Sequence, residues 1–221
     1  MGTDARDGIA GQVVAVIRLD DLSQAAPLAR ALHAGGITAL EFTYTNRAAG
    51  AAIEVAREEL GDAALVGAGT VLDAETARAA LLAGAQFIVT PTVSLGAIEV
   101  CRRYAVPMIC GAFTPTEILT AWQAGSDYVK VFPAGALGPG YIKDVLAPLP
   151  QLRLIPTGGV NESNAADFVR AGAVGLGIGG DLVHRASIER GDWDAVTARA
   201  RRFVEIAAAA GLRRELVGRL P

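Results

Sequence analysis

Residues 107–133, PMICGAFTPTEILTAWQAGSDYVKVFP, contain the pattern that decides the fold. An apolar run with strand character, Pro107–Ala112, is followed by a turn and by an Ala-rich amphipathic segment, Pro115–Ala124. A glycine ends that segment, and a second apolar run, Tyr128–Pro133, comes next. A strand, a helix and another strand in this order predict a βαβ unit, which joins two parallel strands.

The same rhythm extends over nearly the whole chain. Eight apolar runs have strand character: Val13–Arg18, Ala39–Thr43, Ala64–Thr70, Phe87–Pro91, Pro107–Ala112, Tyr128–Pro133, Arg153–Gly158 and Ala173–Ile178. Segments with helical periodicity separate them, among them Leu22–Ala34 and Thr76–Ala83, and Trp193–Ala210 follows as a closing helix. Eight such units predict an α/β fold of the (β/α)8 TIM-barrel type. The alternative is an open doubly wound sheet, but no strand is followed by the GxGxxG pattern of dinucleotide-binding sheets.

The chain shows no linker or low-complexity stretch, so we expect a single domain. Its predicted parts are a lead-in over 1–12, the barrel over 13–210 and a C-terminal tail over 211–221. Four helical segments end in an alanine followed by glycine, which predicts left-handed glycine caps at these positions: Gly35, Gly84, Gly125 and Gly172.

Composition narrows the class of protein. The 221 residues are 52% hydrophobic and 19% charged, with a net charge of −3, which disfavours nucleic acid as a partner. No apolar run approaches the length of a membrane span and no signal peptide is visible, so we expect a cytoplasmic protein without membrane contact. We expect Cys101 and Cys110 to be reduced core thiols. No ligand cluster suggests a metal site, and we expect no cofactor.

Lys130 is one of only two lysines and interrupts the apolar run YVKVFP. Burial lowers the pKa of an amine, so a neutral Lys130 could attack a ketone and form a Schiff base. An edge-strand lysine facing solvent, or a structural ion pair, are the alternatives. Glu41 is surrounded by apolar residues in the same way, and a buried carboxyl can act as a general acid and base. Its alternative is a structural pairing with an arginine.

Glycine-rich turns end the two last predicted strands, at Thr157, Gly158 and Gly159 and at Gly179 and Gly180. In barrels the loops after strands 7 and 8 often bind phosphate through backbone N–H groups. Tight strand-to-helix turns without a ligand would give the same pattern. Thr70 follows a further glycine-lined turn and offers a hydroxyl.

Several motifs resemble those of the 2-keto-3-deoxy-6-phosphogluconate / 4-hydroxy-2-oxoglutarate aldolases. They are GGITALEFT around Glu41, GAGTVL at Gly67–Leu72, FIVTP ending at Pro91, GSDYVKVFPA at Gly125–Ala134 and PTGGV at Pro156–Val160. The resemblance runs from Val13 to about Ala208. It implies a (β/α)8 barrel, a homotrimer and a metal-free class I aldolase that releases pyruvate from a 2-keto-4-hydroxy acid.

The resemblance also implies roles for individual residues. Lys130 matches the Schiff-base lysine and Glu41 the general acid and base. The other matches are Thr70 near the pyruvyl carboxylate, Pro91 and Phe132 as pocket walls, Gly158, Gly159, Gly179 and Gly180 as phosphate turns, and Arg18 as a basic residue near the substrate.

Two positions depart from the family pattern. Thr45 stands where an arginine often holds the substrate carboxylate, which shifts that task to Arg18, Thr70 and backbone groups. Asp181 stands where a serine commonly helps to bind phosphate. We expect Asp181 to point away from the site and cap the next helix. The alternative is that it faces the pocket of a substrate that has no phosphate.

The sequence therefore predicts a pyruvate-releasing class I aldolase. A phosphosugar isomerase or synthase on a similar barrel would share the phosphate turns but would need no lysine in strand 6. A non-catalytic keto-acid binding protein would share the pocket and form no imine.

Overall fold

The computed structural model describes residues 8–213, so the predicted lead-in and tail lie partly outside the described residues. Its sheet has eight strands in the order β7-β6-β5-β4-β3-β2-β1-β8, and every recorded pair is parallel. The strands are β1 (Val13–Ile17), β2 (Ala39–Thr43), β3 (Leu65–Gly69), β4 (Ile88–Val89), β5 (Met108–Ala112), β6 (Tyr128–Val131), β7 (Leu154–Pro156) and β8 (Leu176–Ile178). A parallel bridge between Thr157 and Gly177 joins the two ends of the sheet. The predicted (β/α)8 barrel is confirmed.

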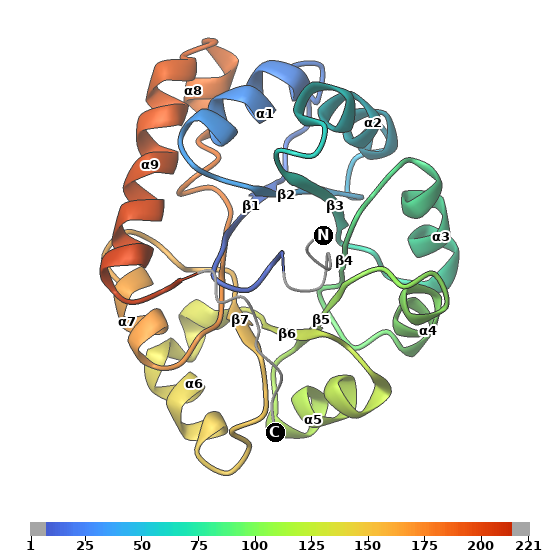
Figure 1. Cartoon of the computed structure of the whole chain (residues 1–221), viewed down its shortest axis with the longest axis vertical. Coiled ribbons are helices and arrows are strands. Elements are labelled where there is room, and N and C mark those ends of the chain that lie inside the picture. Colours follow the sequence, from blue (N-terminus) through green and yellow to red (C-terminus); the bar gives the residue numbers. More distant parts are fainter. Residues whose placement is uncertain (1–7, 214–221) are drawn as a thin grey trace.

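Helices surround the barrel (Figure 1). They are α1 (Ala25–Ala34), α2 (Ala49–Leu60), α3 (Ala74–Leu82), α4 (Leu95–Arg103), α5 (Pro115–Ala124), α6 (Gly138–Leu146), α7 (Ala165–Arg170), α8 (Arg185–Glu189) and α9 (Trp193–Ala209), with a short 3-10 turn, η1 (Ala134–Ala136), before α6. Within residues 8–213, no helix has the length and apolar character needed to cross a membrane.

The predicted runs locate the strands but, except for β2, overestimate their length. The run Phe87–Pro91 contains only the two-residue strand β4, because its remaining apolar residues continue into the flanking loops. The first helix begins at Ala25 and not at Leu22. The Ser23 N–H donates to Asp21 Oδ1 at 2.8 Å, and this local turn delays the helix.

Side chains on alternate strand positions fill the lower half of the barrel. This inner cluster consists of Ile9, Ala10, Val14, Ala39, Phe87, Val89, Ile109, Tyr128 and Ile155. The Tyr128 hydroxyl accepts a hydrogen bond from the Ala10 N–H at 3.2 Å, which fastens the segment before β1 to the floor. Because strand side chains alternate between faces, residues two positions further along each strand point into the barrel above this floor.

Three of the four predicted glycine caps have positive φ angles, at Gly84, Gly125 and Gly172. The prediction for Gly35 is wrong: its φ is −82°, and Gly36 takes the left-handed conformation at +95°. Gly35 still continues the helix, since its N–H donates to Ala31 O at 3.2 Å, and its lack of a side chain serves the packing between α1 and α9. A Cβ at Gly35 would lie only 2.4 Å from Ala200 Cβ, so Gly35 is needed for the close contact of two helices.

We expect Gly35→Ala to lower the free energy of unfolding by about 1–3 kcal/mol, the usual cost of overpacking a filled contact. Gly140 in α6 is the matched control, because a Cβ there would have no neighbour within 4 Å. Gly140→Ala should leave stability unchanged or raise it by up to about 1 kcal/mol. Urea unfolding of both variants checks this, and equal stabilities would contradict the packing argument.

Candidate active site

Lys130 lies inside the barrel, above the hydrophobic floor. Its strand β6 pairs with β5 and β7, so it is not an edge strand, and the residue is only 3% exposed. Tyr128, two positions earlier, belongs to the floor. The Lys130 ammonium nitrogen lies 5.0 Å from the centre of the Phe132 ring. The exposed, solvent-facing alternative for Lys130 is therefore excluded.

Glu41 occupies the corresponding level of β2 and is 2% exposed. Its Oε1 atom is buried without a hydrogen-bond partner among residues 8–213. The carboxyl group extends over β3, where a Cβ at Gly69 would lie 1.7 Å from Oε1. Glycine at this position therefore makes room for the carboxyl group.

Burial shifts the protonation equilibria of both groups. Loss of hydration lowers the pKa of Lys130, an effect that the Glu41 charge opposes and the Arg18 charge reinforces. Loss of hydration raises the pKa of Glu41, while the positive charges of Lys130 and Arg18 oppose the rise. Each group thus acts on the other, and burial favours the neutral amine and the neutral acid.

Two predicted substrate-binding residues lie at the rim, where β1 and β2 end. Arg18 directly follows β1 and is exposed, with its charge acting on both Lys130 and Glu41. Thr45 is exposed too, and its Oγ1 lies 2.9 Å from Thr43 Oγ1.

Thr70 and Pro91 follow β3 and β4 and are partly buried. Thr70 has a φ of +53°, a conformation that costs energy for a residue other than glycine and is typical of functional turns. The Pro91 carbonyl lies against Gly111 of β5, where a Cβ would lie 2.5 Å from its oxygen. These two turns therefore form adjacent parts of the barrel mouth.

The loops after β6 and β7 are hydrogen-bonded to each other. The Ala134 N–H donates to Thr157 O at 2.8 Å, and the Gly135 N–H donates to Gly158 O at 2.7 Å. Gly158 has a φ of +79°, and a Cβ there would lie 2.9 Å from the Phe132 ring. Gly159 approaches Gly135 in the same way. The predicted turn residues and the predicted wall residue Phe132 are thus in direct contact.

The turn after β8 is open. A Cβ at Gly180 would meet no atom within 4 Å, and one at Gly179 would only touch Val16 O at 4.0 Å. The prediction that Asp181 caps the following helix is wrong, because α8 begins after His184 and has no side-chain cap. The Asp181 side chain is exposed, and its backbone carbonyl accepts from Arg199 at 3.1 Å.

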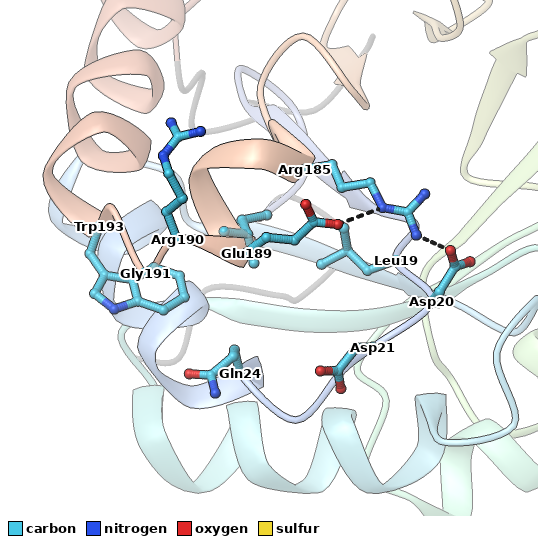
Figure 2. A pocket seen from close by; sticks show the side chains of 10 residues that line it. Leu19, Asp20, Asp21, Gln24, Arg185, Glu189, Arg190, Gly191 and Trp193 are labelled. Carbon is cyan, nitrogen blue, oxygen red and sulfur yellow. Dashed lines mark hydrogen bonds and ion pairs between the residues drawn. The ribbon is translucent and has the colours of Figure 1, made fainter.

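Sequence reasoning missed the side chains that hold the loop after β1. Asn46 Nδ2 donates to Leu19 O at 3.1 Å and to Asp20 O at 2.8 Å. On the other side of this loop, Arg185 pairs with Asp20 and with Glu189 (Figure 2). The only signal in the sequence is an asparagine between a strand and a helix, which is also typical of ordinary turns.

A cavity of about 500 Å³ lies between that loop and α8, and Trp193 and Gln24 line its far side (Figure 2). Neither Lys130 nor Glu41 lines it. Among residues 8–213, no group of three or more His, Cys, Asp or Glu side chains is placed to hold a metal ion. Cys101 and Cys110 are both buried and free, and burial raises the pKa of Cys101 to about 12.

Comparison with known proteins shows the family of this chain. A family model for KDPG and KHG aldolase matches residues 9–199. The chain belongs to this aldolase family. It is 40% identical over 197 residues to the 2-dehydro-3-deoxy-phosphogluconate aldolase of Treponema pallidum, which covers 88% of this chain and 93% of the relative.

Solved structures of aldolases superpose over the barrel. A native KDPGal structure has a TM-score of 0.83 at 34% identity, covering 90% of this chain and 95% of the other. KDPG aldolase from Legionella pneumophila, with pyruvate captured as a covalent carbinolamine, has a TM-score of 0.82 at 29% identity and covers 91% and 97%.

The electrostatic coupling around Lys130 is testable by NMR titration of its labelled amine in a Lys143→Arg background. Arg18→Ala removes a positive charge, so we expect the pKa of Lys130 to rise toward its ordinary value. Glu41→Gln removes a negative charge, so we expect that pKa to fall further. Shifts of the same sign in both variants would contradict this account of the site.

Proposed function

We propose that this chain is a class I aldolase that cleaves a 2-keto-4-hydroxy acid to pyruvate and an aldehyde. The substrate class comprises 2-keto-3-deoxy sugar acids, with or without phosphate, and 4-hydroxy-2-oxoglutarate. One observation carries the proposal: a lysine amine, 3% exposed and with a lowered pKa, shares the barrel interior with a buried carboxyl group. The names of its aldolase relatives support the same chemistry.

In this mechanism the neutral Lys130 amine attacks C2 of the substrate ketone. The carbinolamine loses water to give a protonated imine, with Glu41 moving the protons. Glu41 then takes the proton of the C4 hydroxyl, the C3–C4 bond breaks, and its electron pair passes to the imine as an enamine. The aldehyde leaves, C3 is protonated, and hydrolysis releases pyruvate and the free amine. The imine is the electron sink, so the reaction needs no metal or cofactor.

The surrounding residues bind the rest of the substrate. Arg18 and Thr70 hold the carboxylate, since Thr45 carries no charge. Pro91 and Phe132 form the walls near the amine. Thr157 and the turns at Gly158, Gly159, Gly179 and Gly180 receive the far end of the substrate, where positive φ angles and open space let a ligand approach the backbone.

We also propose that the protein is a homotrimer. Leu72, Leu95 and Phe113 are 60%, 58% and 39% exposed, and they follow the neighbouring strands β3, β4 and β5 at the same end of the barrel. Exposed apolar side chains that gather in this way favour contact with another protein surface. A structural relative forms part of a cage designed by fusing symmetric oligomeric domains.

The two lysines give a matched test of the Schiff base. Reduction with borohydride in the presence of pyruvate should add one pyruvyl group to wild type and to Lys143→Arg, because Lys143 is exposed on α6. Lys130→Arg should take no adduct and lose at least about three orders of magnitude in turnover, because arginine stays protonated. A wild type without an adduct would instead favour the phosphosugar enzyme or the binding protein.

Asp181→Ser tests the role of the exposed carboxylate. A charge in water is well screened, so we expect the preference between phosphorylated and dephosphorylated 2-keto-3-deoxy sugar acids to change less than about tenfold. The measurement is kcat/KM on matched pairs of substrates. A gain of tenfold or more on the phosphorylated substrate alone would place Asp181 in the pocket.

A further inference from the structure

The backbone around Arg18 is held by side chains that follow β2. The last paired residues of β1 and β2 are Ile17 and Phe42, so Arg18 is the first residue beyond the ladder. The Thr43 hydroxyl donates to Ile17 O at 3.2 Å. Asn46 Nδ2 donates to Leu19 O at 3.1 Å and to Asp20 O at 2.8 Å. Carbonyl groups on both sides of Arg18 thus have a fixed partner.

Asn46 is itself fixed. Its Oδ1 accepts from the Ala48 N–H at 2.9 Å, and its own N–H donates to Thr43 O at 3.3 Å. The amide therefore bridges the turn that begins α2 and the loop that carries Arg18. The second fastening of this loop, between Asp20 and Arg185, is an ion pair whose side chains are 85% and 59% exposed (Figure 2). Exposed ion pairs contribute little, so Asn46 is the principal fastening.

We propose that Asn46 is a positioning residue that holds Arg18 for the carboxylate of the keto acid. The inference rests on the proposed function and deepens it. It explains how Arg18 can bind the carboxylate in place of an arginine at position 45. A loop fixed before the ligand binds loses less conformational freedom on binding. Arg47, the next residue, is exposed.

The test compares pyruvate with its uncharged amide, pyruvamide, in borohydride trapping on Lys130. For each ligand, intact mass gives the concentration that half-saturates adduct formation. Asn46→Ser retains an oxygen that can accept from the Ala48 N–H but is too short to reach the two carbonyls. We expect it to raise the half-saturating pyruvate concentration about 3- to 10-fold, the value of one or two hydrogen bonds, and to change that of pyruvamide less than about twofold.

Arg18→Ala should raise the half-saturating concentration of pyruvate about 10- to 100-fold more than that of pyruvamide, since it removes a charged hydrogen bond to the carboxylate. The double variant Arg18→Ala with Asn46→Ser should have the same half-saturating pyruvate concentration as Arg18→Ala alone, because Asn46 acts through Arg18. Arg47→Ala is the matched control for loss of a positive charge in the neighbouring loop. It should leave the half-saturating concentrations of both ligands unchanged.

If Asn46→Ser raises the half-saturating concentrations of pyruvate and pyruvamide equally, Asn46 has only a structural role and the proposal is overturned. Additive effects of the two substitutions on the half-saturating pyruvate concentration, or no effect of Asn46→Ser on it, would overturn the proposal as well. If Asn46→Ser does not fold, Asn46→Gln displaces the amide by one methylene and takes its place in the test. It must raise the half-saturating concentration of pyruvate and leave that of pyruvamide nearly unchanged. Failure of the aldolase proposal is distinguishable, since wild type would then form no adduct with either ligand.

Discussion

The site depends on the shared burial of one amine and one carboxyl group in an apolar barrel. Neither Lys130 nor Glu41 would keep its ordinary pKa there, because both have lost their hydration. Each also partly compensates for the other's burial, which makes the pair tolerable where a single charge would be costly. The apolar surroundings that stabilise the core therefore also favour a neutral amine on Lys130 beside the carboxyl group of Glu41.

The barrel geometry brings these groups together without any local sequence contact. Parallel register places side chains from all strands in layers, and the lowest layer is filled by the large rings of Phe87 and Tyr128. The next layer holds Glu41 and Lys130, and Gly69 beside Glu41 leaves the space that its carboxyl group fills. An apolar floor and a layer with two ionisable groups follow from residues only two positions apart along each strand.

The sequence predicts those features that repeat along the chain or depend on neighbouring residues. The alternation of apolar runs with Ala-rich segments is sufficient for the barrel, and β2 and α5 agree with their predicted bounds. The buried positions of Lys130 and Glu41 follow from alternation within a strand. Contacts between distant segments are beyond such reasoning: α9 leaves no room for a side chain at position 35, and Asn46 meets carbonyl groups 26 and 27 positions earlier. The error at Asp181 has a local origin, since the turn after β8 runs on to His184 before α8 begins.

The space shared by Glu41 and Gly69 has an evolutionary consequence. The carboxyl oxygen occupies the place of a side chain on the neighbouring strand, with only 1.7 Å between that oxygen and a Cβ at position 69. Any larger residue at 69 displaces the carboxyl group of Glu41 unless that side chain is shortened or lost. The two positions are therefore coupled, and a lineage that keeps the carboxyl group in this place keeps the glycine with it.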